Sequence, residues 1–127
     1  MRYLLDTHVF LWLNNQPAKL SSRVREMLTS GEHEFLLSTA TPWEIQIKRQ
    51  LGKLHLDQPL STILASHLDD GGLGLLPIEL THIEKLGTLE SHHKDPFDRM
   101  LIAQALAETI SIITVDQAFE SYPVEVV

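Results

Sequence analysis

The chain has no cysteine, which excludes disulfide bonds and thiolate metal sites. It also lacks any apolar run close to the roughly 20 residues that a membrane-spanning helix needs. The first acid, Asp6, comes too early for a secretory signal, so we expect a cytoplasmic protein. Bases are scarce as well: 10 lysines and arginines stand against 17 acids, a formal net charge of −7. This balance argues against a protein that binds nucleic acid through a broad basic surface. The acids are either spread over the surface, gathered around a cation, or presented to a basic partner.

The length of 127 residues and the hydrophobic content of 43% predict one globular domain, residues 1–127. Short apolar segments typical of strands alternate with helical patterns. The expected strands are 2–5, 34–38, 73–78, 111–115 and a final edge strand at 122–127. The expected helices are 9–13, 22–30, 41–51, 59–68, 80–86 and 96–107, with a short extended piece at 54–56. This alternation predicts an α/β fold with a mainly parallel sheet.

The helix that begins at Pro96 carries an acid on its apolar side. Asp95 is a natural N-cap, and proline suits the first helical position because its missing N–H would have no partner there. At about 100° per residue from Asp98, Ile102 lies near 40° and Gln104 near 240°. Asp98 therefore shares the core-facing side of the helix, whereas a surface acid would lie elsewhere.

Four acids fall at junctions that a parallel sheet brings to one edge. Asp6 and Asp116 each end a strand, and sites in such sheets form beyond the carboxyl ends of the strands. Asp98 begins the helix that leads to the fourth strand, and Glu44 begins the helix after the second. Unit charges about 4 Å apart repel by roughly 4 kcal/mol at an effective dielectric of about 20, so we expect a bound cation. All-oxygen ligands favour Mg²⁺ or Mn²⁺, which suit phosphodiester hydrolysis.

Each acid also has a structural explanation. Asp6 can cap the first helix, and Asp116 can cap a short helix at 117–121. Thr41 and Glu44 match the capping-box pattern, and Asp95 is itself a helix cap. The placement of the acids together, rather than any one of them, favours a site.

The histidines and bases near these acids give weaker signals. No two histidines have the spacing of a zinc-binding helix, so we expect surface or supporting roles for His8, His92 and His93. A local basic cluster is typical of a solvated face, and a phosphate-positioning role is the less favoured interpretation. Its members are Lys48, Arg49, Lys53 and His55. Lys48 can also form an i,i+4 pair with Glu44.

Taken in order, the motifs resemble those of PIN-domain ribonucleases, the VapC-type toxins of bacterial type II toxin–antitoxin modules. The matching segments are Leu4-Leu5-Asp6-Thr7-His8, Thr41-Pro42-Trp43-Glu44-Ile45 with Lys48, Asp95-Pro96-Phe97-Asp98-Arg99 and Thr114-Val115-Asp116. Each segment is weak alone, but the ordered set runs nearly end to end and is specific.

The resemblance implies a three-layer α/β/α fold around a five-stranded parallel sheet. It also implies endonucleolytic cleavage of RNA, a Mg²⁺ or Mn²⁺ cofactor, a homodimer and inhibition by a VapB-type antitoxin. The implied catalytic residues are Asp6, Glu44, Asp98 and Asp116. The supporting or substrate-binding positions are Thr7, Thr114, Arg99, Asp95 and Lys48.

In the leading hypothesis, Asp6 and Asp116 hold the metal, Asp98 holds it directly or through water, and Glu44 orients or deprotonates the attacking water. One alternative is a PIN-like nuclease of RNA processing outside a toxin–antitoxin pair. A metal-dependent phosphatase would carry Asp-x-Asp after the first strand, whereas Thr7 follows Asp6 here. A non-catalytic binding module, whose acids only cap helices, is a third alternative. For the dimer face, the apolar regions 9–13 and 54–64 are the candidates.

Overall fold

The computed structural model describes residues 1–92 and 95–127, and its centre is a parallel sheet of four strands in the order β3-β2-β1-β4. The strands are β1 (Arg2–Leu5), β2 (Glu34–Ser38), β3 (Leu73–Leu76) and β4 (Ser111–Ile113). The helices are α1 (Thr7–Asn15), α2 (Ser22–Thr29), α3 (Ala40–Gln50), α4 (Leu60–His67), α5 (Leu80–Leu86) and α6 (Pro96–Glu108). Three 3₁₀ turns complete the described elements: η1 (Pro17–Lys19), η2 (Asp69–Gly71) and η3 (Gln117–Ser121).

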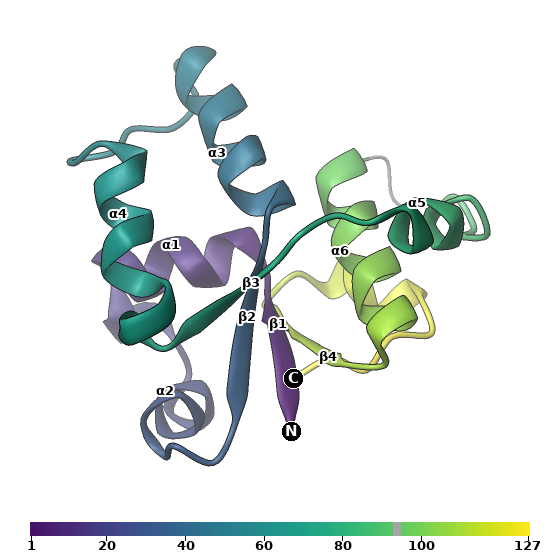
Figure 1. The fold of residues 1–127 in the computed structure, drawn as a ribbon, viewed down its shortest axis with the longest axis horizontal. Coiled ribbons are helices and arrows are strands. Elements are labelled where there is room, and N and C mark those ends of the chain that lie inside the picture. Colours follow the sequence, from purple (N-terminus) through teal and green to yellow (C-terminus); the bar gives the residue numbers. More distant parts are fainter. Residues whose placement is uncertain (93–94) are drawn as a thin grey trace.

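The sheet is the middle of three layers, as predicted. Alternate residues of a strand face opposite sides, so β1 sends Leu5 into one core and Leu4 into the other. The first core includes Phe10 of α1 and Ile63 of α4, and the second includes Ile102 of α6. In Figure 1, α1, α2 and α4 lie on one side of the sheet, and α5 and α6 lie on the other.

The prediction of a fifth strand at the C-terminus is wrong. The C-terminal segment runs beside β4 but forms a single bridge with it, between Ile112 and Val126. The N–H of Ile112 donates to the carbonyl of Glu125 at 2.9 Å, and the N–H of Val127 donates to the carbonyl of Ile112 at 2.9 Å. Pro123 has no N–H to donate to a ladder, so pairing begins only after it.

Three other expected extended pieces are shorter than predicted or absent. β4 ends at Ile113 rather than residue 115, so Asp116 lies beyond the strand and does not end it. β3 ends at Leu76, because the next residue is Pro77 and cannot continue the hydrogen-bonded ladder. The segment 54–56 forms no strand, and Leu54 and Leu56 instead pack as half-buried residues against the first core.

The predicted starts of α2, α5 and α6 are confirmed, whereas α1 begins at Thr7 rather than residue 9, and α4 begins at Leu60 rather than Pro59. A third correction concerns α3. The Oγ of Ser21 accepts the N–H of Val24 at 3.2 Å and caps α2. Asp95 caps α6, and Pro96 is its first residue. The capping box at Thr41 is wrong, because α3 already begins at Ala40, whose N–H donates to the Oγ of Ser38 at 3.0 Å.

In the described parts of the chain, no helix has the length and apolarity needed to cross a membrane.

Candidate active site at the carboxyl edge of the sheet

Asp6 is a buried acid at the carboxyl end of β1. Its backbone N–H donates to the carbonyl of Ile113 at 3.0 Å, which continues the pairing of β1 with β4 by one residue. This pairing brings Thr114 beside Asp6, and the Oγ1 of Thr114 donates to the Oδ2 of Asp6 at 2.6 Å. Asp6 is only 3% exposed and occupies the N-cap position of α1, as predicted. The backbone N–H of His8 lowers the pKa of its carboxyl, although no well-formed capping hydrogen bond is present. Capping therefore leaves the burial of Asp6 unexplained.

Glu44 is a second buried acid at the same edge, carried by the first turns of α3 and also 3% exposed. The Oγ1 of Thr7 donates to its Oε1 at 2.8 Å. Lys48, one helical turn later, forms an ion pair with its Oε2. Thr41 completes the cluster, with its hydroxyl 3.1 Å from that of Thr7. The predicted i,i+4 pair of Glu44 and Lys48 is thus present.

The pKa values of Asp6 and Lys48 are both shifted. Burial raises the pKa of Asp6, although the hydrogen bond from Thr114 lowers it; the charge of Glu44 adds to the rise. Burial lowers the pKa of Lys48, but the hydrogen bond and charge of Glu44 outweigh this effect and raise it overall. The charges of Asp95 and Asp98 add to that rise. The ammonium of Lys48 therefore lies in the combined negative field of α3 and the start of α6.

The other predicted acids are less buried. The Oδ1 of Asp95 accepts the N–H of Phe97 at 2.8 Å and that of Asp98 at 3.1 Å, so its capping role is confirmed. Asp98 is half-buried in the first turn of α6. Asp116 is exposed, and its Oδ1 accepts the N–H of Ala118 at 2.9 Å as the cap of η3.

The acids do not form a preassembled metal cage. Within residues 1–92 and 95–127, no three acidic or histidine side chains are close enough together to hold a metal ion as they stand. The ordering of Asp6 and Glu44 instead comes from two threonines and a lysine.

Arg99 and His92 make contacts outside the Asp6–Glu44 cluster. Arg99 donates through Nη1 to the carbonyl of Glu90 at 2.9 Å and to the hydroxyl of Tyr122 at 3.2 Å. His92 pairs with Glu90 at 2.8 Å, whereas His8 is exposed on α1 but adjoins Asp6 and lowers its pKa. His93 lies outside the described residues.

Two features near the site were missed by the sequence interpretation. The hydroxyl of Thr41, in the first turn of α3, hydrogen-bonds to that of Thr7. The sequence pattern predicts a helix cap at Thr41 and therefore does not predict this contact. Trp43 lies edge-on to Phe97, with ring centroids 4.9 Å apart. The signal for the second was in the motifs themselves, since these aromatic residues immediately precede Glu44 and Asp98.

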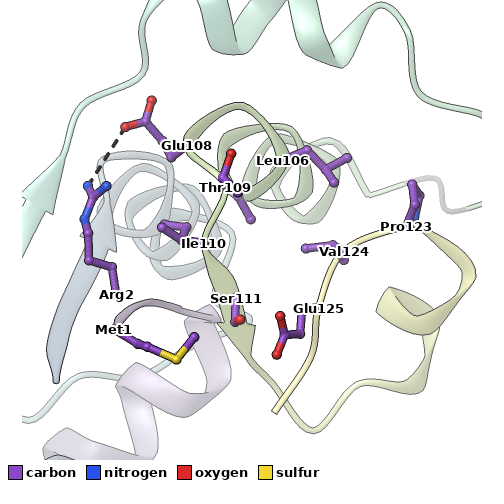
Figure 2. Close-up of a pocket in the computed structure, with 11 residues that line it drawn as sticks. Met1, Arg2, Leu106, Glu108, Thr109, Ile110, Ser111, Pro123, Val124 and Glu125 are labelled. Carbon is purple, nitrogen blue, oxygen red and sulfur yellow. Dashed lines mark ion pairs between the residues drawn. The ribbon is translucent and has the colours of Figure 1, made fainter. Parts of the chain in front are cut away.

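A hollow of about 280 Å³ opens beside Glu44, and its lining includes Thr7, His8, Lys48 and Lys53. A separate cavity of about 460 Å³ lies at the amino ends of β1 and β4 (Figure 2). Arg2 and Glu108 form a 3.9 Å ion pair there, at the opposite edge of the sheet from Asp6. Of the four predicted acids, Glu44 lines the first hollow, and Asp6, Asp98 and Asp116 are not part of its lining.

The sequence matches the PIN domain family over residues 3–125, so the chain belongs to this family. PIN domains are in general nucleases that use divalent metals. No curated protein matches the chain in sequence.

Several solved structures share the fold. VapBC2 from Rickettsia felis, bound to a DNA fragment from its promoter, aligns with a TM-score of 0.76 at 17% identity, over 100% of this chain and 98% of that chain. VapBC-1 from nontypeable Haemophilus influenzae aligns with a TM-score of 0.67 at 20% identity, over 100% and 97%. FitAcB from Neisseria gonorrhoeae aligns with a TM-score of 0.66 at 21% identity, over 98% and 95%.

Proposed function

We propose that the chain is a metal-dependent endoribonuclease and the toxin of a toxin–antitoxin pair. The observation that carries the proposal is the burial of Asp6 and Glu44 at the carboxyl edge of a parallel sheet in a PIN domain. Burying a carboxylate costs free energy, and neither of these two makes a well-formed capping hydrogen bond. A catalytic role explains why both are retained there.

Mg²⁺ or Mn²⁺ fits the donors at this edge. Asp6 is desolvated and close enough to Glu44 for their charges to interact, and a cation relieves both penalties. We assign Asp6, Asp98 and Asp116 to the ion. The Oδ1 of Asp116 accepts the N–H of Ala118, so its Oδ2 is the oxygen that we assign to the ion. Once bound, a divalent ion lowers the pKa of a coordinated water and stabilises negative charge on the phosphate.

Glu44 is the group that we assign to the attacking water. The hydroxyl of Thr7 and the ammonium of Lys48 hold its two oxygens in one orientation. A carboxylate fixed in this way can orient a water molecule and accept its proton. Thr114 does the same for Asp6 by holding one carboxylate oxygen.

The proposed partners are RNA as substrate, a VapB-type antitoxin as inhibitor and a second copy of the chain as dimer partner. Similar folds in VapBC complexes, including one from Salmonella typhimurium with a TM-score of 0.72, support the antitoxin. For the dimer face, Val9 and Phe10 are buried in the core of the protomer and are not available. An RNA substrate and an antitoxin of this kind place the protein in the cytoplasm.

The decisive variant is Asp6→Asn, which keeps the side-chain shape and removes the charge. We expect it to abolish Mg²⁺- or Mn²⁺-dependent cleavage of RNA while circular dichroism reports an intact fold. Asp70→Asn is the matched control, because it removes an exposed acid from η2, and its activity should equal that of the unmodified protein. Full cleavage by Asp6→Asn would refute the assignment.

Calorimetry separates this proposal from a binding module whose acids are only structural. Titration with Mn²⁺ should show a site in the unmodified protein that Asp6→Asn weakens or removes. Equal Mn²⁺ affinity in both proteins, with no RNA cleavage by either, would favour the non-catalytic module.

A further inference from the structure

We propose that Trp43 and Phe97 form a stacking platform for an unpaired nucleobase of the RNA beside the acidic site. This inference rests on the proposed nuclease function, because it names the part of the substrate that binds next to Glu44 and Asp98. The platform is defined by these two aromatic side chains, one from α3 and one from α6.

Trp43 is unusually exposed for a tryptophan. Its side chain is 57% exposed, and among the described residues it is the only aromatic one in the group of exposed large hydrophobic side chains. The other members are aliphatic, such as Leu80 and Ile83 of α5. Tryptophan offers a large flat π-surface, and every base has a π-face, so stacking between them needs no specific sequence.

The ring of Trp43 is also held in place. It meets the ring of Phe97 at a centroid distance of 4.9 Å and an interplanar angle of 85°, an edge-to-face arrangement that is favourable for aromatic pairs. A side chain that is already ordered loses little conformational entropy when a ligand stacks on it. The contact with Phe97 therefore prepares Trp43 for binding.

The platform lies close to the candidate catalytic acids. Trp43 immediately precedes Glu44 in α3, and Phe97 immediately precedes Asp98 in α6. In Figure 1 the starts of α3 and α6 approach each other above the carboxyl ends of the strands. A base stacked there would fix the adjoining phosphodiester close to the carboxylates.

Positive charge near Glu44 favours a nucleic acid over an apolar protein surface. The hollow of about 280 Å³ beside Glu44 is lined by Lys48 and Lys53, and an adjoining hollow of about 520 Å³ is lined by Arg49, Lys53 and His55. In a chain of net charge −7, such a concentration of bases is suited to phosphate groups. Basic side chains and exposed aromatic rings are the two parts of a binding path for single-stranded nucleic acid, and both are present here.

The test uses fluorescence, because the chain has only two tryptophans, Trp12 and Trp43. Trp12→Phe leaves Trp43 as the single reporter. In EDTA, where divalent metal is removed, we titrate this protein with oligoadenylate RNA and with an abasic RNA of equal length and charge. We expect the oligoadenylate to quench Trp43 and the abasic strand to leave its emission unchanged. Equal quenching by both strands, or quenching by neither, would overturn the platform.

Affinity and kinetics give a second measurement, by filter binding and RNA cleavage. Trp43→Ala should weaken oligoadenylate binding about tenfold or more and raise KM by a similar factor with little change in kcat. Trp43→Phe should restore most of the affinity, which a purely structural defect would not predict. Leu80→Ala, at an exposed apolar residue of α5, is the matched control and should behave as the unmodified protein.

The outcomes separate this inference from the proposed function. Base-dependent quenching without RNA cleavage would support the platform and contradict the nuclease. Cleavage with the same KM in Trp43→Ala would support the nuclease and contradict the platform. A change of oligomeric state in Trp43→Ala, with RNA binding unchanged, would assign this face to a second copy of the chain and overturn the proposal.

Discussion

Replacing Lys48 by methionine tests whether the ion pair with Glu44 holds the candidate site together. Methionine keeps most of the aliphatic stem and removes the ammonium group. The side chain of Glu44 is 4% exposed and that of Lys48 is 39% exposed, so the pair is buried at one end and solvated at the other. Without Lys48, one oxygen of a buried carboxylate loses its partner.

The expected coupling free energy lies between two limits. Hydrogen bonds to charged groups contribute about 1.5–3 kcal/mol, and exposed ion pairs contribute about 0.2–1 kcal/mol. Solvent screens Lys48 but hardly reaches Glu44, so we expect a coupling of about 1.5 kcal/mol. The attraction of Lys48 to Asp95 and Asp98 adds to the total cost of its removal.

A double-mutant cycle measured by urea unfolding isolates this coupling. Lys48→Met should lower the free energy of unfolding by about 2 kcal/mol in the unmodified protein and by about 0.5 kcal/mol in the Glu44→Gln background. Lys85→Met on α5 is the control, with an expected change within about 0.5 kcal/mol. An equal cost of Lys48→Met in both backgrounds would refute the coupling.

The pH dependence of the cycle has a defined sign. The folded protein holds the proton of Lys48 more tightly than the unfolded chain, whose pKa is 10.5. The stabilisation is therefore fully present below pH 10.5 and is lost only as the pH rises through the higher pKa of the folded state. The same coupling should be measured at pH 7 and pH 9, and a fall between them would contradict the raised pKa of Lys48.

Two further predictions concern buried polar groups. Because burial raises the pKa of Asp6 above 3.8, the stability of the metal-free protein should fall as pH rises from 3.8 through the pKa of the folded state. Asp6→Asn should flatten this dependence in urea unfolding between pH 4 and pH 7, and an unchanged slope would contradict it. His82 is fully buried, accepts the N–H of Glu79 at 3.0 Å and lies 3.1 Å from Glu108. His82→Ala should therefore lower the free energy of unfolding by about 2–4 kcal/mol in thermal melts, and a loss below about 0.5 kcal/mol would contradict this role.

Local sequence rules predicted those parts of the fold that depend on neighbouring residues. The bounds of β1, β2 and α5 agree with the prediction, because apolar runs and helix-start residues are local signals. Asp95 was predicted as a cap for the same reason, since a side chain that bonds its own helix needs no distant partner.

Features that depend on distant pairing were predicted poorly. In place of the predicted C-terminal strand there is a single bridge to β4. Its length depends on the short β4 and on Pro123, which cannot donate a backbone hydrogen bond. Gln104 was placed on the more polar side of α6, yet it is fully buried, with its Nε2 3.4 Å from the carbonyl of Leu76. The contact of Thr7 with Glu44 joins residues 37 positions apart, and no local pattern encodes it.

The four predicted acids differ in burial and in helix capping, and their spacing in the sequence does not predict these differences. Asp116 bonds a backbone N–H in the next turn and is exposed, so helix capping is sufficient to explain it. Asp6 and Glu44 are buried without a well-formed capping hydrogen bond, and threonine and lysine side chains from other turns and strands hold them. Since burial of an acid costs free energy, these two carry the stronger case for function. Capping occupies only the Oδ1 of Asp116, so its role as a cap is compatible with binding the ion through Oδ2.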